Sequence, residues 1–129
     1  MSHISRSKSK LGRKVNKSLM KEAAKMVAKR LNGKVSDKVH DYRGGNSTKV
    51  DVAISTNDIP YGIGISVTPD GVEFVGDSWN IEHSWEEVKK QVNQTYSTLA
   101  YAAAVRKQGY NVEIVQRGNE IHIVAEEAA

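Results

Sequence analysis

The sequence predicts an α+β domain in which an antiparallel sheet of about six strands carries two helices, packed mainly on one face. Two segments place apolar residues at the three- and four-residue spacing of an amphipathic helix, and six shorter segments alternate apolar and polar residues as half-buried strands do. Their order along the chain is α-β-β-β-β-α-β-β. This order favours antiparallel strands and contains no βαβ nucleotide-binding unit.

The first helix is predicted at residues 16–31. Asn16 or Ser18 can cap its beginning, and Asn32 with Gly33 ends it. Lysines recur every fourth residue on one side, where like charges repel and an anionic partner would relieve the repulsion. The apolar residues on the other side are Leu19, Met20, Ala23, Ala24, Val27 and Leu31.

Four strands are predicted between the two helices. Residues 34–42 have the polar alternation of an edge strand, and residues 44–47 form the turn after it. Residues 49–54 and 63–67 follow as half-buried strands. The tight-turn sequence at residues 68–71 then returns the chain antiparallel at residues 72–75, with Phe74 as a core ring.

The longer helix is predicted to begin at a capping box formed by Ser84 and Glu87, and to end at Gly109. Two further strands, at residues 112–115 and 121–125, flank Gly118 and Asn119, which suit a two-residue hairpin turn. The apolar stripe of the helix consists of Trp85, Val88, Val92, Tyr96, Leu99 and Ala103.

Composition predicts one domain and a basic arm. The chain has 129 residues, enough for a single core, and residues 1–15 are so polar that they are expected to be a flexible arm before a domain at residues 16–129. The absence of cysteine excludes disulfides and thiolate metal sites and favours a reducing, cytoplasmic compartment. We expect neither a secretory signal nor a membrane span, although the N-terminus also has the composition of an organelle transit peptide.

Charge is distributed unevenly along the sequence. Residues 1–38 hold 12 Lys or Arg against two acids, and residues 39–129 hold 7 against 13. Such a basic segment favours an anionic partner, such as RNA, DNA, lipid headgroups or an acidic protein, although it could also dock on the acidic half. The candidate anion-binding residues are Arg6, Lys8, Lys10, Arg13, Lys14, Lys17, Lys21, Lys25 and Lys29.

A second candidate site is the polar and aromatic segment before the longer helix. Asp77, Trp79 and Asn80 lie in the loop between the sheet and that helix, a position that often carries function. An exposed Trp79 would be an anchor for a protein partner. The alternative is structural: Trp85 packs under the helix and Asp77 or Asn80 satisfies loop amides.

Two other patterns are better explained without chemistry. The four histidines have no metal-ligand spacing, and His40 and His122 could meet only if their strands adjoin. Residues 43–48 could cradle a phosphate with backbone amides, but they lack the P-loop spacing, so a hairpin turn is predicted instead. No metal and no cofactor are therefore expected.

Several short motifs together resemble one known family. They are the Met-Ser-His start with Ser5, Gly62-Ile63-Gly64, Asp77, Trp85, Val92, Tyr96 and Gln108-Gly109. In these the chain is similar to the hypothetical chloroplast reading frame thirty-five family and its bacterial, archaeal and phage relatives, a domain of unknown function (family 1257). The resemblance implies one small domain without an assigned catalytic residue, and it disfavours the transit peptide. The first helix is more lysine-rich than the family pattern.

The sequence leaves two hypotheses of function. The leading one is a non-catalytic accessory or adaptor domain that binds a protein partner, with the basic segment contacting an anionic surface. The alternative is a small nucleic-acid-binding protein that uses the N-terminal lysines and arginines. An enzyme is not expected, because no catalytic motif is present.

Overall fold

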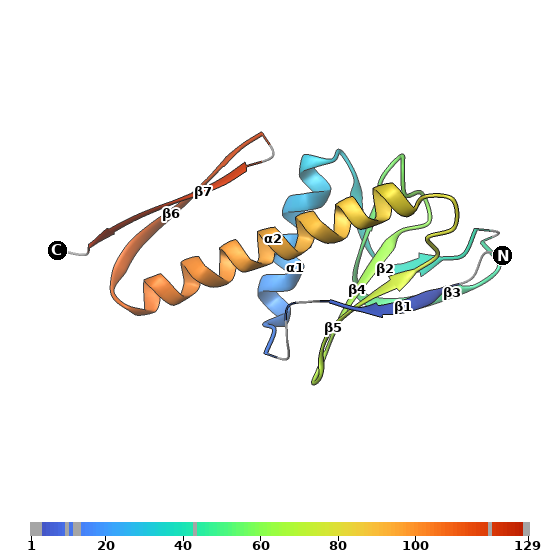
Figure 1. Cartoon of the computed structure of the whole chain (residues 1–129), viewed down its shortest axis with the longest axis horizontal. Helices are drawn as coiled ribbons and strands as arrows, with labels where there is room; N and C mark the ends of the chain where they lie inside the picture. Colours follow the sequence, from blue (N-terminus) through green and yellow to red (C-terminus); the bar gives the residue numbers. More distant parts are fainter. Residues whose placement is uncertain (1–3, 10, 12–13, 43, 119, 128–129) are drawn as a thin grey trace.

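Five strands form one antiparallel sheet in the order β1-β5-β4-β3-β2. The computed structural model describes residues 4–9, 11, 14–42, 44–118 and 120–127. The helices α1 (Lys17–Arg30) and α2 (Glu82–Lys107) cross each other over one face of this sheet (Figure 1). The strands are β1 (Ser5–Lys8), β2 (Lys34–His40), β3 (Ser47–Ser55), β4 (Ile63–Thr68) and β5 (Gly71–Gly76).

The last two strands stand apart from this sheet. β6 (Tyr110–Arg117) and β7 (Glu120–Glu127) pair only with each other, in a hairpin that turns back after α2 and lies beside it (Figure 1). The 26 residues of α2 are about 39 Å long, whereas the six residues of β5 span about 20 Å. The C-terminal part of α2 therefore extends past the sheet, and the hairpin packs on this helix instead of joining the sheet.

The α+β class and the predicted order of helices and strands from α1 onward are confirmed. Two features differ from the expectation: the strands are divided five and two between separate sheets, and β1 precedes α1 inside the segment expected to be a flexible arm. All four residues of β1 are exposed, and the strand pairs with β5 through its backbone, from Ser5 opposite Gly76 to Lys8 opposite Glu73. Because backbone pairing at an edge needs no apolar side chain, residue periodicity gives no sign of this strand.

The main core lies between the sheet and the two helices. α1 begins at the predicted cap, where Asn16 Oδ1 accepts a hydrogen bond from the Leu19 amide (3.0 Å), and it buries small residues that let α2 approach closely. Phe74 is fully buried beneath α2, as predicted. The main contributors are Met20, Ala23, Ala24, Val27, Ile54, Ile63, Ile65, Phe74, Trp85, Val88 and Val92.

The predicted capping box at the start of α2 is wrong. The helix begins at Glu82, with Ile81 at the cap position and no side-chain cap, so Ser84 lies inside the first turn. The Ile81 amide donates to the Ser78 carbonyl (3.1 Å), and the Ile81 carbonyl accepts from the Trp85 amide (2.9 Å). This turn leads the chain into the helix before Ser84 and places Trp85 under it, 6% exposed.

Candidate functional site

Three aromatic side chains from three different segments meet beside the loop that leads into α2. Tyr42 follows β2, Tyr61 precedes β4 and Trp79 follows β5. The Tyr42 ring makes edge contacts with Trp79, with centroids 4.8 Å apart, and with Tyr61 at 5.9 Å. Tyr42 is 48% exposed and Trp79 is 45% exposed. We call Tyr42, Tyr61 and Trp79 the aromatic surface.

The buried carboxylate of Asp77 connects the two loops that carry this surface. Its Oδ2 accepts a hydrogen bond from the Tyr42 amide (2.9 Å), and its Oδ1 accepts one from the Trp79 amide (3.1 Å). Asp77 is only 3% exposed. Since each oxygen holds the backbone of one aromatic residue, this single side chain fixes the relative position of Tyr42 and Trp79.

A second aspartate orders the turn next to Tyr42. Asp41 Oδ1 accepts from the Gly45 amide (3.0 Å), and Oδ2 accepts from the Asn46 side-chain amide (2.9 Å). Burial raises the pKa of Asp41, but hydrogen bonds from Asn46, Gly45 and Gly44 outweigh this effect, so its pKa lies below the ordinary value. These bonds occupy amides that would otherwise be free to cradle a phosphate. The predicted hairpin turn is confirmed, with His40 opposite Ser47.

The structure therefore brings the predicted residues Asp77, Trp79 and Asn80 together in one loop. Asn80 is exposed and adopts a positive φ of 62°, and its role is to turn the backbone toward α2. The sequence analysis missed Tyr42 and Tyr61 as members of the site. Both are aromatic residues in segments that flank strands, and only the tertiary structure brings these segments together, with the His40 amide donating to the Tyr61 carbonyl (2.9 Å).

The candidate basic residues do not form one patch. Lys10 and Arg13 lie outside the described residues. Arg6 pairs with Glu73 (3.2 Å) and Lys17 pairs with Asp51 (3.5 Å), so carboxylates of the sheet partly neutralise both cations. Arg6 and Lys8 are on β1, at the opposite sheet edge from β2, whereas α1 lies over β2 and β3.

Lysines remain exposed on α1 itself. Lys21, Lys25 and Lys29 form a row along its outer side and make no ion pair with the described part of the chain. Lys14 is also exposed, just before the helix. The row is thus the densest set of free cations among the described candidates.

The strands that carry His40 and His122 do not adjoin, so the structure does not meet the condition under which these histidines could pair. His40 is on β2 and His122 is on β7, in different sheets. His122 Nε2 is instead 3.1 Å from Glu120 Oε2. Within the described ranges, no three His, Asp or Glu side chains group as metal ligands would, and neither helix is long and apolar enough to cross a membrane.

One family matches the chain. Residues 27–123 match the model described as "Protein of unknown function (DUF1257)". The matched region runs from the last part of α1 into β7, so it contains the whole aromatic surface and Asp77, whereas most of the basic segment precedes it. No curated protein and no solved structure matches the chain.

Proposed function

The chain belongs to the DUF1257 family of proteins of unknown function, as its motifs predicted, and we propose that it is a non-catalytic cytoplasmic accessory domain that binds a protein partner through the aromatic surface. One observation carries the proposal: Tyr42 and Trp79 are each about half exposed, touch each other, and stand on backbone held by the buried Asp77 carboxylate. Trp and Tyr are the residues most enriched among interface anchors.

The rigidity of the surface favours binding. Side chains that are already ordered lose little conformational freedom when a partner covers them, so more of the contact energy remains as affinity. β2 is the edge strand of the sheet and ends next to Tyr42. The His40 amide at this end already donates to the Tyr61 carbonyl (2.9 Å), so an extended segment of the partner would pair with the earlier part of the strand. In this proposal the basic N-terminal segment contacts an anionic surface beside the interface.

The experiment is quantitative co-purification with the full chain, Trp79→Ala, and Tyr101→Ala as a matched control. Tyr101 is 61% exposed on α2 and lies far along the chain from the aromatic surface. Truncating an anchor costs about 2 kcal/mol or more, which corresponds to a loss of about 30-fold in affinity. Proteins retained by the native chain and by Tyr101→Ala should be lost with Trp79→Ala. Equal retention by all three chains would contradict the proposal.

A second candidate function is nucleic-acid binding, favoured by the row of Lys21, Lys25 and Lys29. Its test is fluorescence anisotropy with labelled RNA and DNA across a salt series. Replacing all three lysines by alanine should lower the slope of log K against log salt by about 2 to 3, because each neutralised phosphate contributes about 0.7 to 0.9. Trp79→Ala should leave this binding unchanged. A slope that does not depend on the lysines would exclude the row as the contact.

A further inference from the structure

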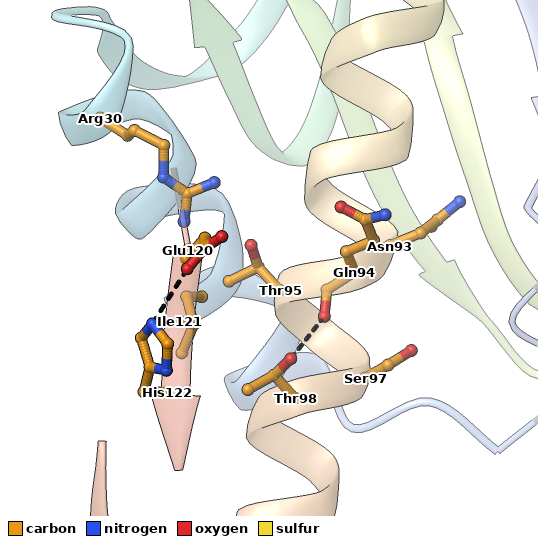
Figure 2. Close-up of a pocket in the computed structure, with 9 residues that line it drawn as sticks. All are labelled: Arg30, Asn93, Gln94, Thr95, Ser97, Thr98, Glu120, Ile121 and His122. Carbon is orange, nitrogen blue, oxygen red and sulfur yellow. Dashed lines mark hydrogen bonds and ion pairs between the residues drawn. The ribbon is translucent and has the colours of Figure 1, made fainter. Parts of the chain in front are cut away.

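An open cavity of about 670 Å³ lies between the end of α1, the middle of α2 and the beginning of β7 (Figure 2). Its volume is within the usual range of about 300 to 1,000 Å³ for small-molecule sites. The residues important for its chemistry are Arg30, Asn93, Thr95, Thr98, Glu120 and His122. None of them belongs to the aromatic surface.

Arg30 is the unusual member of this set. Its Nη1 donates a hydrogen bond to Gln91 Oε1 (3.0 Å), whereas Nε and Nη2 are buried and have no partner among the described residues. Burial also lowers the pKa of Arg30. A guanidinium remains charged in proteins, and leaving its buried donors unpaired is costly. The local structure therefore lacks an acceptor at this position.

The two unpaired donors have a specific geometry. Nε and Nη2 lie on the same edge of the planar guanidinium, and their N–H bonds point in nearly parallel directions. This edge is complementary to two oxygens of one carboxylate or phosphate group, which accept both bonds at once. A water molecule or a single carbonyl would satisfy the pair less completely.

The carboxylate of Glu120, which lines the same cavity, does not fill this position. Figure 2 shows the Arg30 guanidinium directed toward Glu120 and His122. Glu120 nevertheless pairs with His122 at 3.1 Å, its side chain is 77% exposed, and it forms no ion pair with Arg30. Thr98 Oγ1 donates to the Gln94 carbonyl (2.9 Å) and keeps its lone pairs as acceptors. Guanidinium donors and hydroxyl acceptors thus line the same cavity.

We propose that this cavity binds a small anionic metabolite, whose carboxylate or phosphate group accepts a bidentate pair of hydrogen bonds from Nε and Nη2 of Arg30. The threonine hydroxyls and the Asn93 side chain contact the remaining polar groups of the ligand. The charges that face the bound anion are Arg30, which attracts it, Glu120, which repels it, and His122, which attracts it when protonated. The function of this site is separate from that of the aromatic surface.

The test is an NMR titration of the full chain with inorganic phosphate and, separately, with succinate, using sodium chloride at matched ionic strength as the reference. Saturable shifts of the Arg30 Nε–H signal and of the Thr95 and Thr98 amides are expected with at least one probe, and the tighter probe identifies the ligand class. Arg30→Lys keeps the charge but loses the paired edge, so the affinity should fall at least about tenfold. Lys29→Ala is the matched control, since Lys29 is the exposed neighbour, and it should bind as the native chain does.

Glu120→Gln provides a second test that does not alter Arg30. It removes the repelling carboxylate, so phosphate or succinate should bind more tightly than to the native chain. Two results would overturn the proposal. One is the absence of saturable shifts at Arg30 with both probes. The other is a Glu120→Gln chain that is less stable and binds no tighter, which would mean that Glu120 itself occupies the paired edge of Arg30 in solution.

Discussion

Replacing Asp77 by alanine tests whether one buried carboxylate holds the aromatic surface. The change leaves the amides of Tyr42 and Trp79 without the acceptors that they now contact at 2.9 and 3.1 Å. An unsatisfied buried donor costs about 1 to 3 kcal/mol, so we expect a loss of about 3 kcal/mol of unfolding free energy for the pair. With an m value of about 2 kcal/mol/M, the urea midpoint should fall by about 1.5 M.

Asp77→Asn separates the hydrogen bonds from the shape of the side chain. Asparagine has nearly the same volume but only one carbonyl oxygen, and its NH₂ group would face one of the two amide donors. We therefore expect about half of the alanine effect, about 1 to 2 kcal/mol, in urea unfolding at neutral pH. Asp58→Ala is the control, because Asp58 is exposed and its carboxylate has no hydrogen bond to the described residues.

The same variants connect stability to binding. Tyr42 and Trp79 keep their side chains in Asp77→Asn, but their loops are no longer joined by both carboxylate oxygens. The affinity for a protein partner should fall, and the tryptophan emission should change while the chain is still folded. The reasoning would be refuted if Asp77→Ala unfolded at the native urea midpoint, because the carboxylate would then contribute nothing to the loop connection.

Three further predictions concern the scaffold of the site. Gly76→Ala should cost about 2 to 4 kcal/mol in urea unfolding, because its Cβ would lie 2.6 Å from the Trp85 ring at a φ of +152°, and an unchanged midpoint would contradict this clash. Because the folded-state pKa of Asp41 is depressed, its stabilisation is present above the ordinary value of about 3.9 and is lost as the pH falls below it. In Asp41→Asn, the free energy of unfolding should therefore fall less steeply as the pH is lowered through this range. If the variant and the native chain showed the same dependence on pH, Asp41 would not contribute to the loss of stability in acid. Phe74→Ala should lower the free energy of unfolding by about 3 to 5 kcal/mol, because Phe74 is fully buried, whereas Val124→Ala should lower it by less than about 0.5 kcal/mol, because Val124 is 47% exposed. Similar losses for the two variants in thermal unfolding would contradict the assigned core.

Local sequence patterns predicted the helices and central strands because those elements bury one face. The alternation of residues around Ile54 and Phe74 follows from that burial, and the Asn16 cap marks the beginning of α1. β1 was missed for the opposite reason, since its four residues are exposed and its pairing uses only the backbone. The β6–β7 hairpin was predicted, but its separation from the five-stranded sheet was missed, because the sheet that a strand joins depends on tertiary placement and not on the local pattern.

The candidate site was only partly predictable for a similar reason. Asp77 and Trp79 are close in sequence, so the loop that contains both stands out. Tyr42 joins them only because the ends of β2 and β5 approach each other although the two strands are not paired, which is a tertiary property that local sequence does not show. Arg30 was not among the candidate residues, although its side chain turns inward and donates to Gln91. Helical spacing places a residue on a face but does not decide whether a long side chain reaches solvent.

The aromatic surface and the Arg30 cavity lie at different positions along α2, and this separation matters for interpreting both proposals. Trp79 precedes the helix, whereas Asn93 and Thr98 are 11 and 16 residues beyond its first residue, Glu82. At about 1.5 Å per residue, the cavity lies roughly 17 to 24 Å along the helix axis from its start. Changes more than about 10 Å apart without shared partners act almost additively. An effect of Arg30→Lys on partner binding, or of Trp79→Ala on anion binding, would therefore require coupling transmitted through α2 itself, since no described residue contributes to both sites.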